Sequence, residues 1–266
     1  MRLKTALSAA DPAGVMKLIP ILLVSLVFLG IGLRLFRSGA RGEGQERWLS
    51  VFFLGMACGL PMRMAAVEIQ LASGSGGEML NALGHAALSL TTIAILFFVW
   101  RVFRPDDVWA RAVVYAFSAF QIALIPALVW LGGLRDETGG IVVVANVSRS
   151  LPLFWALFES LRYRGLMSRR VELGLADPVV ANRFTLFSLW TGSLAVLPTV
   201  VVAIRLYLRG TGLDEAAVIA ENPVGWIMPL IRIVLVSGGL TAAVAIWLSF
   251  FPPRFYIARL EAGGQP

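Results

Sequence analysis

The sequence predicts an all-α, polytopic membrane protein with seven transmembrane helices. The first observation is composition, because 58% of the 266 residues are hydrophobic and only 15% are charged, whereas soluble domains carry about 25% charged residues. The second is a mean hydropathy of +0.79. The third is a series of apolar runs of about 18 residues or more, each long enough to cross a hydrocarbon core of about 30 Å as a helix.

Seven such runs follow one another along the chain, with short connections between them. Because no connection is long enough for a separate domain, we expect a single seven-helix transmembrane domain over residues 1–266. The predicted spans are residues 16–36, 47–66, 80–103, 108–132, 140–164, 178–207 and 224–251.

The distribution of basic residues predicts the orientation of these spans. With the N-terminus outside, the cytoplasmic loops hold about twice as many lysines and arginines as the outer loops, in agreement with the positive-inside rule. Arg34, Arg37 and Arg41 come after the apolar stretch from Leu18 to Leu33, which we interpret as an uncleaved helix because no clear signal cleavage site follows it. We expect an outer N-terminus, a cytoplasmic C-terminus and a bacterial inner membrane location.

Aspartate and asparagine residues next to prolines mark the starts of several spans. Asp177 before Pro178 predicts an N-cap for the sixth span. Asp107 is expected to cap the fourth span in the same way, and Asn222 precedes the seventh. Within the second span, Gly55 and Gly59 predict a small-residue face for close helix contact.

Two segments are expected at the cytoplasmic surface. Pro252 and Pro253 end the last span because neither residue has a backbone N–H to donate, and residues 255–260 then suit a short amphipathic helix on the membrane. The loop over residues 164–177 is interpreted either as an extension of the fifth helix, attracted to anionic lipid headgroups, or as a docking site for a cytoplasmic protein.

Arg149 and Arg232 fall inside apolar spans. At a rise of about 1.5 Å per residue, they lie about 13 Å and about 12 Å from the outer ends of their helices. An ionisable side chain at that depth is costly and is therefore a functional-site hypothesis. Because a guanidinium binds carboxylate and phosphate groups through paired hydrogen bonds, an anionic or carbonyl-bearing ligand is expected.

Four further polar residues are expected in the same outer half of the bilayer. His85, the single histidine, lies about 8 Å into its span. Arg63 and Glu68 lie near the outer end of the second span. Asn146 comes three residues before Arg149 and therefore shares its helix face. Together with the two arginines, these residues are predicted to line an outward-opening, electropositive pocket.

A structural interpretation of the same residues remains open. In this interpretation the arginines serve as internal locks that bond to Asn146, Gln121, Glu68 or to carbonyl groups freed by proline kinks. Glu159 lies too near the cytoplasm to reach them. For His85, a buried structural hydrogen bond fits better than a catalytic role.

No cofactor is expected, and the chain is not expected to be an enzyme. One histidine and one cysteine, Cys58, cannot form a zinc site. The last six spans hold no lysine for a Schiff base and no carboxylate pair for a proton relay. The net charge of +7 is spread over short loops at helix ends, which excludes a basic groove for nucleic acid.

Two segments resemble an uncharacterised family of bacterial seven-helix membrane proteins. They are GLADPVVANRF at Gly174–Phe184 and FFPPRFY at Phe250–Tyr256. Both motifs are structural, an N-cap with proline and a helix stop, so the resemblance implies the layout and carries no activity. The layout is also similar to the sensor regions fused to some bacterial histidine kinases, which is a likeness of fold alone.

These observations lead to a sensor-like hypothesis. The protein is expected to bind a small anionic or lipidic ligand from the lipid bilayer or the outer side and to signal to a separate cytoplasmic protein partner. One alternative is an accessory or structural subunit with a membrane protein partner. The other is a small transporter, against which the lack of a convincing internal repeat counts.

Overall fold

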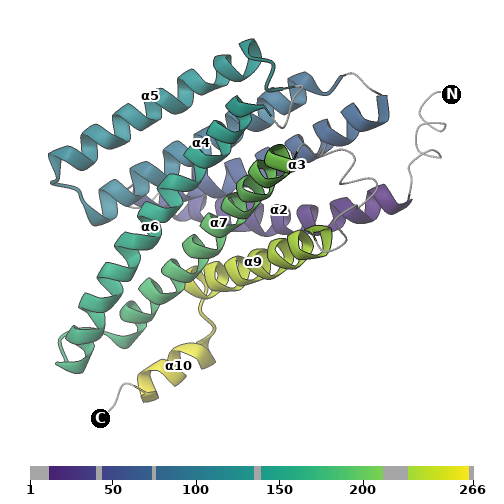
Figure 1. The fold of residues 1–266 in the computed structure, drawn as a ribbon. Coiled ribbons are helices and arrows are strands. Elements are labelled where there is room, and N and C mark those ends of the chain that lie inside the picture. Colours follow the sequence, from purple (N-terminus) through teal and green to yellow (C-terminus); the bar gives the residue numbers. More distant parts are fainter. Residues whose placement is uncertain (1–11, 40–43, 74–75, 135–138, 212–226, 264–266) are drawn as a thin grey trace. The chain divides into compact units, whose positions relative to one another are not determined.

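The computed structural model describes residues 12–39, 44–73, 76–134, 139–211 and 227–263 (Figure 1). Every regular element within these ranges is a helix. Their bounds are α2 Pro12–Gly39, α3 Gln45–Ser73, α4 Glu78–Phe103, α5 Val108–Trp130, α6 Gly140–Glu172, α7 Pro178–Thr211, α9 Ile227–Phe250 and α10 Arg254–Gly263.

The long apolar helices confirm a multi-pass, all-α membrane protein. Six helices in the described ranges are long and apolar enough to cross a membrane. A seventh span is obtained if the segments Ser237–Phe250 and Arg254–Leu260, which meet at a bend of 81°, are taken together. The orientation of the termini and the single-domain organisation stay predictions.

The chain divides into two compact units, Met1–Thr91 and Thr92–Pro266, with the boundary inside α4. In the first unit α2 packs along α3. The rings of Phe28 and Phe53 lie 5.8 Å apart, and both side chains are buried. The hydroxyl of Ser50 donates a hydrogen bond of 2.8 Å to the carbonyl of Gly32, which fixes the register of the two helices.

Glycines bring α3 and the first part of α4 into close contact, as the small-residue face predicts. A Cβ atom on Gly55 would lie 2.4 Å from Cγ2 of Thr91, and one on Gly59 would lie 2.9 Å from Cγ of Leu88. Such distances are too short for real carbon atoms. The two backbones therefore approach to a distance that only glycine permits.

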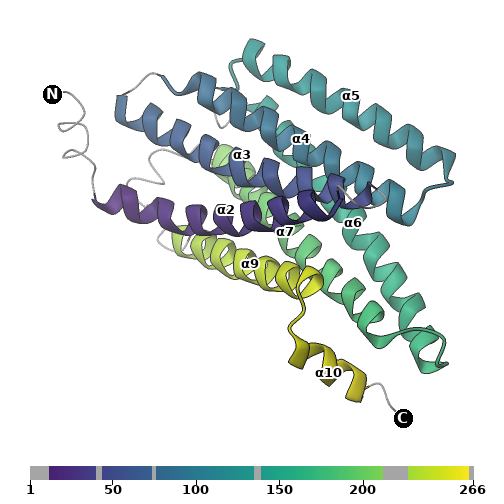
Figure 2. The ribbon, with the colours of Figure 1, turned by 180° about the vertical axis from the view of Figure 1, so that it is seen from behind.

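The second unit is built on the antiparallel pair α6 and α7, with α9 alongside α7 (Figure 2). A Cβ atom on Gly192 of α7 would lie 3.3 Å from Cδ1 of Leu157 on α6, so the two helices are in close contact there. Trp190 is fully buried, as expected for a tryptophan at this depth. Its ring packs edge-on against Phe187, with centroids 4.7 Å apart, and Phe187 stacks on Phe98 of α4.

The two predicted aspartate caps have different outcomes. Asp177 caps α7 as expected, because its Oδ1 accepts a hydrogen bond of 2.8 Å from the backbone N–H of Val179. Asp107 occupies the N-cap position of α5 but makes no side-chain cap. Its Oδ2 instead accepts a hydrogen bond of 3.1 Å from Arg104. The predicted cap at Asn222 lies outside the described residues.

The predicted C-terminal amphipathic helix is present as α10. It follows the two prolines after α9 and turns away at 81°. The hydroxyl of Tyr256 accepts a hydrogen bond of 2.8 Å from Nδ2 of Asn182, which fastens α10 to the start of α7. The predicted extension of the fifth helix is also helical, since α6 continues without a break to Glu172 and a left-handed Gly174 ends it, with φ of 68°.

Candidate functional site

Arg149 lies on the buried face of α6. Residues 142, 145, 149, 152 and 156 recur at helical spacing and are all buried, so they form one stripe that faces the interior of the unit. Arg149 is 9% exposed. The arginine predicted from its depth in an apolar span is therefore a buried side chain and not one that faces lipid.

The structure describes the side chains of some, but not all, of the other predicted ligand residues. Asn146 is half-buried on α6, one turn from Arg149. Arg232 belongs to α9, but its side chain lies outside the described residues. His85 is 0% exposed on α4, and Arg63 and Glu68 are half-buried on α3.

Arg63 and the His85 region meet within the first unit. A Cβ atom on Gly84 would lie 2.6 Å from Cγ of Arg63, so the stem of the arginine crosses α4 at the residue before His85. Asn146 and Arg149 belong to the second unit. The outward pocket that was expected to combine all of these residues therefore stays a prediction.

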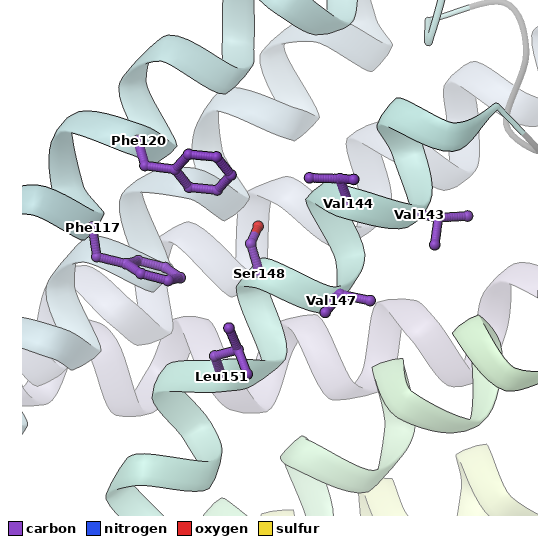
Figure 3. A pocket seen from close by; sticks show the side chains of 7 residues that line it. All are labelled: Phe117, Phe120, Val143, Val144, Val147, Ser148 and Leu151. Carbon is purple, nitrogen blue, oxygen red and sulfur yellow. The ribbon is translucent and has the colours of Figure 1, made fainter.

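An apolar crevice lies between α5 and α6 (Figure 3). Its volume is about 420 Å³. Ser148 supplies its polar atom, and its hydroxyl points between the side chains of the two helices. The lining residues are Phe117, Phe120, Val143, Val144, Val147, Ser148 and Leu151. None was predicted as a site residue, because valine and phenylalanine in a span have the pattern of lipid-facing residues.

A neutral hydrogen bond joins the two helices beside this crevice. Nε2 of the fully buried Gln121 donates to the hydroxyl of Ser148 at 2.9 Å, and that hydroxyl donates to the carbonyl of Ala145. The amide oxygen of Gln121 accepts no hydrogen bond from the described residues. Gln121 is therefore a partner of Ser148. The structural interpretation of Arg149 stays open for the other partners that it named, Asn146, Glu68 and the carbonyl groups at proline kinks.

A cluster of charges lies further along α6, around Glu159. This carboxylate is 2% exposed, and its Oε1 accepts a hydrogen bond of 2.7 Å from Nε of Arg104 in the α4–α5 turn. Arg162, one turn along α6, approaches Oε2 at 3.6 Å. Nη1 of Arg104 also pairs with Asp107 at 3.1 Å. One buried acid and one exposed acid thus hold the arginine of the turn.

Aromatic rings complete the cluster. Nε1 of Trp155 donates to Oε1 of Glu159 at 3.4 Å, and the guanidinium of Arg104 lies 5.6 Å from the ring centre of Trp109. The hydrogen bond with Glu159 raises the pKa of Arg104. Burial lowers this pKa by a smaller amount, and the hydrogen bond with Asp107 raises it further. Arg104 therefore stays charged at any physiological pH.

Sequence reasoning missed this cluster. The sequence analysis counted the arginines of the loops, Arg104 and Arg162 among them, only as evidence for the orientation of the spans. It did not consider Glu159 further because that residue is too far from Arg149. The spacing of Trp155, Glu159 and Arg162 at one-turn intervals was the available signal. The cross-helix partner was not readable, because Arg104 lies 55 residues away.

The described ranges contain no group of three or more histidine, cysteine, aspartate or glutamate residues that is placed to hold a metal ion. Cys58 is exposed on α3. Comparison with known protein families, with curated proteins and with solved structures finds no match for this chain.

Proposed function

We propose that the protein is a sensor-like protein of the bacterial inner membrane, with its N-terminus outside. Its ligand is a small amphiphile that combines an apolar chain with an anionic or carbonyl-bearing group. Arg149 binds the polar group, and the crevice between α5 and α6 takes the chain. Asn146 and Arg232 are assigned to the same polar end.

The observation that carries this proposal is the position of Ser148 and Arg149. They are consecutive residues, yet Ser148 lines an apolar crevice of about 420 Å³ while Arg149 is buried on the adjoining face. This volume falls within the range of about 300–1,000 Å³ that is usual for small-molecule sites. An arginine that directly follows a residue of an apolar crevice suits a ligand with one charged end and one hydrophobic end.

The continuity of α6 supports a route for the signal. One helix of 33 residues carries the crevice wall, Arg149, Glu159 and the cytoplasmic extension. A ligand that enters the crevice separates α5 from α6 there and tilts α6 about the contact between Arg104 and Glu159, which stays closed. This tilt moves the cytoplasmic end of α6 beyond the contact.

The test is native mass spectrometry of the full chain, extracted gently from its own membrane. We expect a co-purifying amphiphile that is retained in Arg149→Lys and lost in Arg149→Gln and Arg232→Gln. Arg101→Gln is the matched control, because Arg101 is exposed at the end of α4 and lies against its neighbour Trp100. A ligand that persists in Arg149→Gln, or loss of folding in every Arg149 variant, contradicts the proposal.

A second function, an accessory subunit of a membrane complex, is favoured by the surface of α5. This helix buries only one residue per turn, in a single narrow stripe. Large side chains around the rest of it are exposed, among them Tyr115, Ile122 and Trp130. Co-purification of a membrane protein, with no small molecule, would favour this function over ligand sensing.

A further inference from the structure

The helices α6 and α7 extend well past the apolar belt of the second unit. On α6 the exposed large apolar residues follow one another from Val144 to Leu161, after which Arg162 begins a basic stretch that also contains the exposed Leu166. Leu157 on α6 lies next to Gly192 on α7, and this contact fixes the register of the antiparallel pair. The exposed Leu189 of α7 is therefore at the same level as Leu161 of α6. We call residues 162–183, which join these levels, the hairpin tip.

The length of the hairpin tip places its end in water. From Leu161, α6 continues to Glu172, a rise of about 16 Å. The headgroup layer on each side of a bilayer is only about 5–8 Å thick, and an ordinary tilt of about 20° shortens the projection by little. Even from the exposed Leu166, α6 rises about 9 Å further to Glu172, so we expect the turn at Gly174 to lie beyond the headgroups.

The surface of the hairpin tip combines positive charge with apolar side chains. Its exposed arginines outnumber its exposed acids, Glu172 and Asp177. Leu173 is 71% exposed and Leu175 is 73% exposed, on either side of Gly174. The arginines are Arg162, Arg164, Arg169, Arg170 and Arg183.

The helix α10 adds to the same surface. The hydrogen bond between Tyr256 and Asn182 holds it against the start of α7 (Figure 1). Phe255 is 75% exposed on α10, and Arg254 and Arg259 are exposed beside it. Two separate parts of the chain thus present arginines around exposed apolar side chains at one end of the second unit.

We propose that the hairpin tip and α10 form a docking surface for an acidic, amphipathic helix of a protein partner. Exposed arginines interspersed with exposed apolar side chains complement a helix that carries acidic residues beside an apolar stripe. The projection of the tip past the headgroup layer favours a protein over a lipid surface. This inference deepens the proposed function. It rests on that function in one respect, the assignment of the hairpin tip to the cytoplasmic side of the membrane.

Binding is tested with the full chain in nanodiscs of phosphatidylcholine. The probe is a fluorescein-labelled helical peptide of about 20 residues, with leucine on one face and glutamate elsewhere. We expect Arg169→Glu with Arg170→Glu to weaken binding about tenfold or more, as expected when buried or central charge pairs are reversed. Leu173→Ser with Leu175→Ser should weaken it about as much, although all the arginines remain.

Arg101→Glu with Arg111→Glu is the matched control, since both arginines are exposed and lie outside the hairpin tip. Equal weakening in this control would show that the peptide senses only total charge, and this would overturn the proposal. Absence of peptide binding to the unmodified chain would overturn it as well. Nanodiscs expose both faces of the protein, so neither result depends on the orientation or the ligand of the proposed function.

A lipid surface is distinguished by fluorescence quenching. Leu173→Cys and Leu175→Cys are made in a Cys58→Ser background, because Cys58 is the single cysteine, and are labelled with an environment-sensitive dye. We expect quenching by iodide in the water and none by nitroxide-labelled lipids. Quenching by the lipids would place the tip on the membrane and overturn the proposal.

Discussion

Two contacts on α6 connect it to the preceding pair of helices, and they differ in chemistry. At the crevice, the neutral amide of Gln121 meets the hydroxyl of Ser148 at 2.9 Å. About 16 Å further along α6, the charged Glu159 meets Arg104 at 2.7 Å. Among the described residues, neither Oε1 of Gln121 nor Oε2 of Glu159 accepts a hydrogen bond. The two contacts differ in charge, because Oε2 of Glu159 also lies 3.6 Å from the guanidinium of Arg162, whereas Gln121 and Ser148 are both neutral.

This difference separates a fixed end from an end that can open. A neutral hydrogen bond between membrane helices contributes on average only about 0.6 kcal/mol. Breaking one side of a buried ion pair costs about 3–5 kcal/mol, because a charge is left without its partner. We therefore expect α5 to separate from α6 at the crevice while the α4–α5 turn stays attached to Glu159.

The largest expected effect comes from removing the buried carboxylate. Glu159→Leu should lower the free energy of unfolding by about 3 kcal/mol, because Arg104 then lacks its main partner. Adding Arg104→Met should recover part of that loss, since an apolar pair replaces an incomplete ionic one. Thermal unfolding in mild detergent measures both variants.

Glu172→Gln is the control for this prediction, because Glu172 is an exposed acid on the same helix. Its effect should stay within about 0.5 kcal/mol. If Glu159→Leu were as mild as this control, the two contacts on α6 would not differ in strength and the fixed end would lie elsewhere.

A smaller effect is expected at the crevice. Gln121→Leu and Ser148→Ala should each cost about 1 kcal/mol or less, and the coupling energy in their double-mutant cycle should be about 0.6 kcal/mol. Gln121→Leu also removes an unbonded amide oxygen, which offsets part of the loss. A coupling energy as large as that between Arg104 and Glu159 would mean that both ends of α5 are equally fixed.

The smallest effect is expected from solution conditions. The raised pKa of Arg104 means that its stabilising contribution is complete below the pKa of an arginine in the unfolded chain and is lost only as the pH rises through the higher folded pKa. The coupling energy between Arg104 and Glu159 should thus be constant from about pH 7 to pH 10. Added salt should weaken the coupling of Arg104 with the more exposed Asp107 and leave that with Glu159 nearly unchanged.

Titration of the two coupling energies in double-mutant cycles measures this prediction. A decline of the Glu159 coupling at moderate salt would show that water reaches the pair. The ionic contact would then be no stronger than an ordinary surface pair, at about 0–1 kcal/mol.

Local features of the fold were predictable from the sequence, and contacts between distant segments were not. Hydropathy and helix-end chemistry located the spans, the cap at Asp177 and the helix stop at Pro252, because each depends on neighbouring residues. The same reasoning assigned Asp107 to a cap, since Arg104 was not known to compete for its carboxylate.

The candidate site shows the same limit. The burial of Arg149 followed from its position in an apolar span. The crevice and the Glu159 cluster required knowledge of which helices are neighbours and of their register, which a single sequence does not contain. Periodicity can state which face a residue occupies, but it does not name the helix that packs against that face.

The sharp bend before α10 has a mechanical consequence. Two successive prolines interrupt the backbone hydrogen bonding after α9, and the bond from Asn182 to Tyr256 ties α10 to α7 instead. The C-terminal helix therefore follows rotations of α7 and is insulated from those of α9. A spectroscopic reporter attached to α10 would therefore record the motion of α7, although more than forty residues of chain separate the two helices.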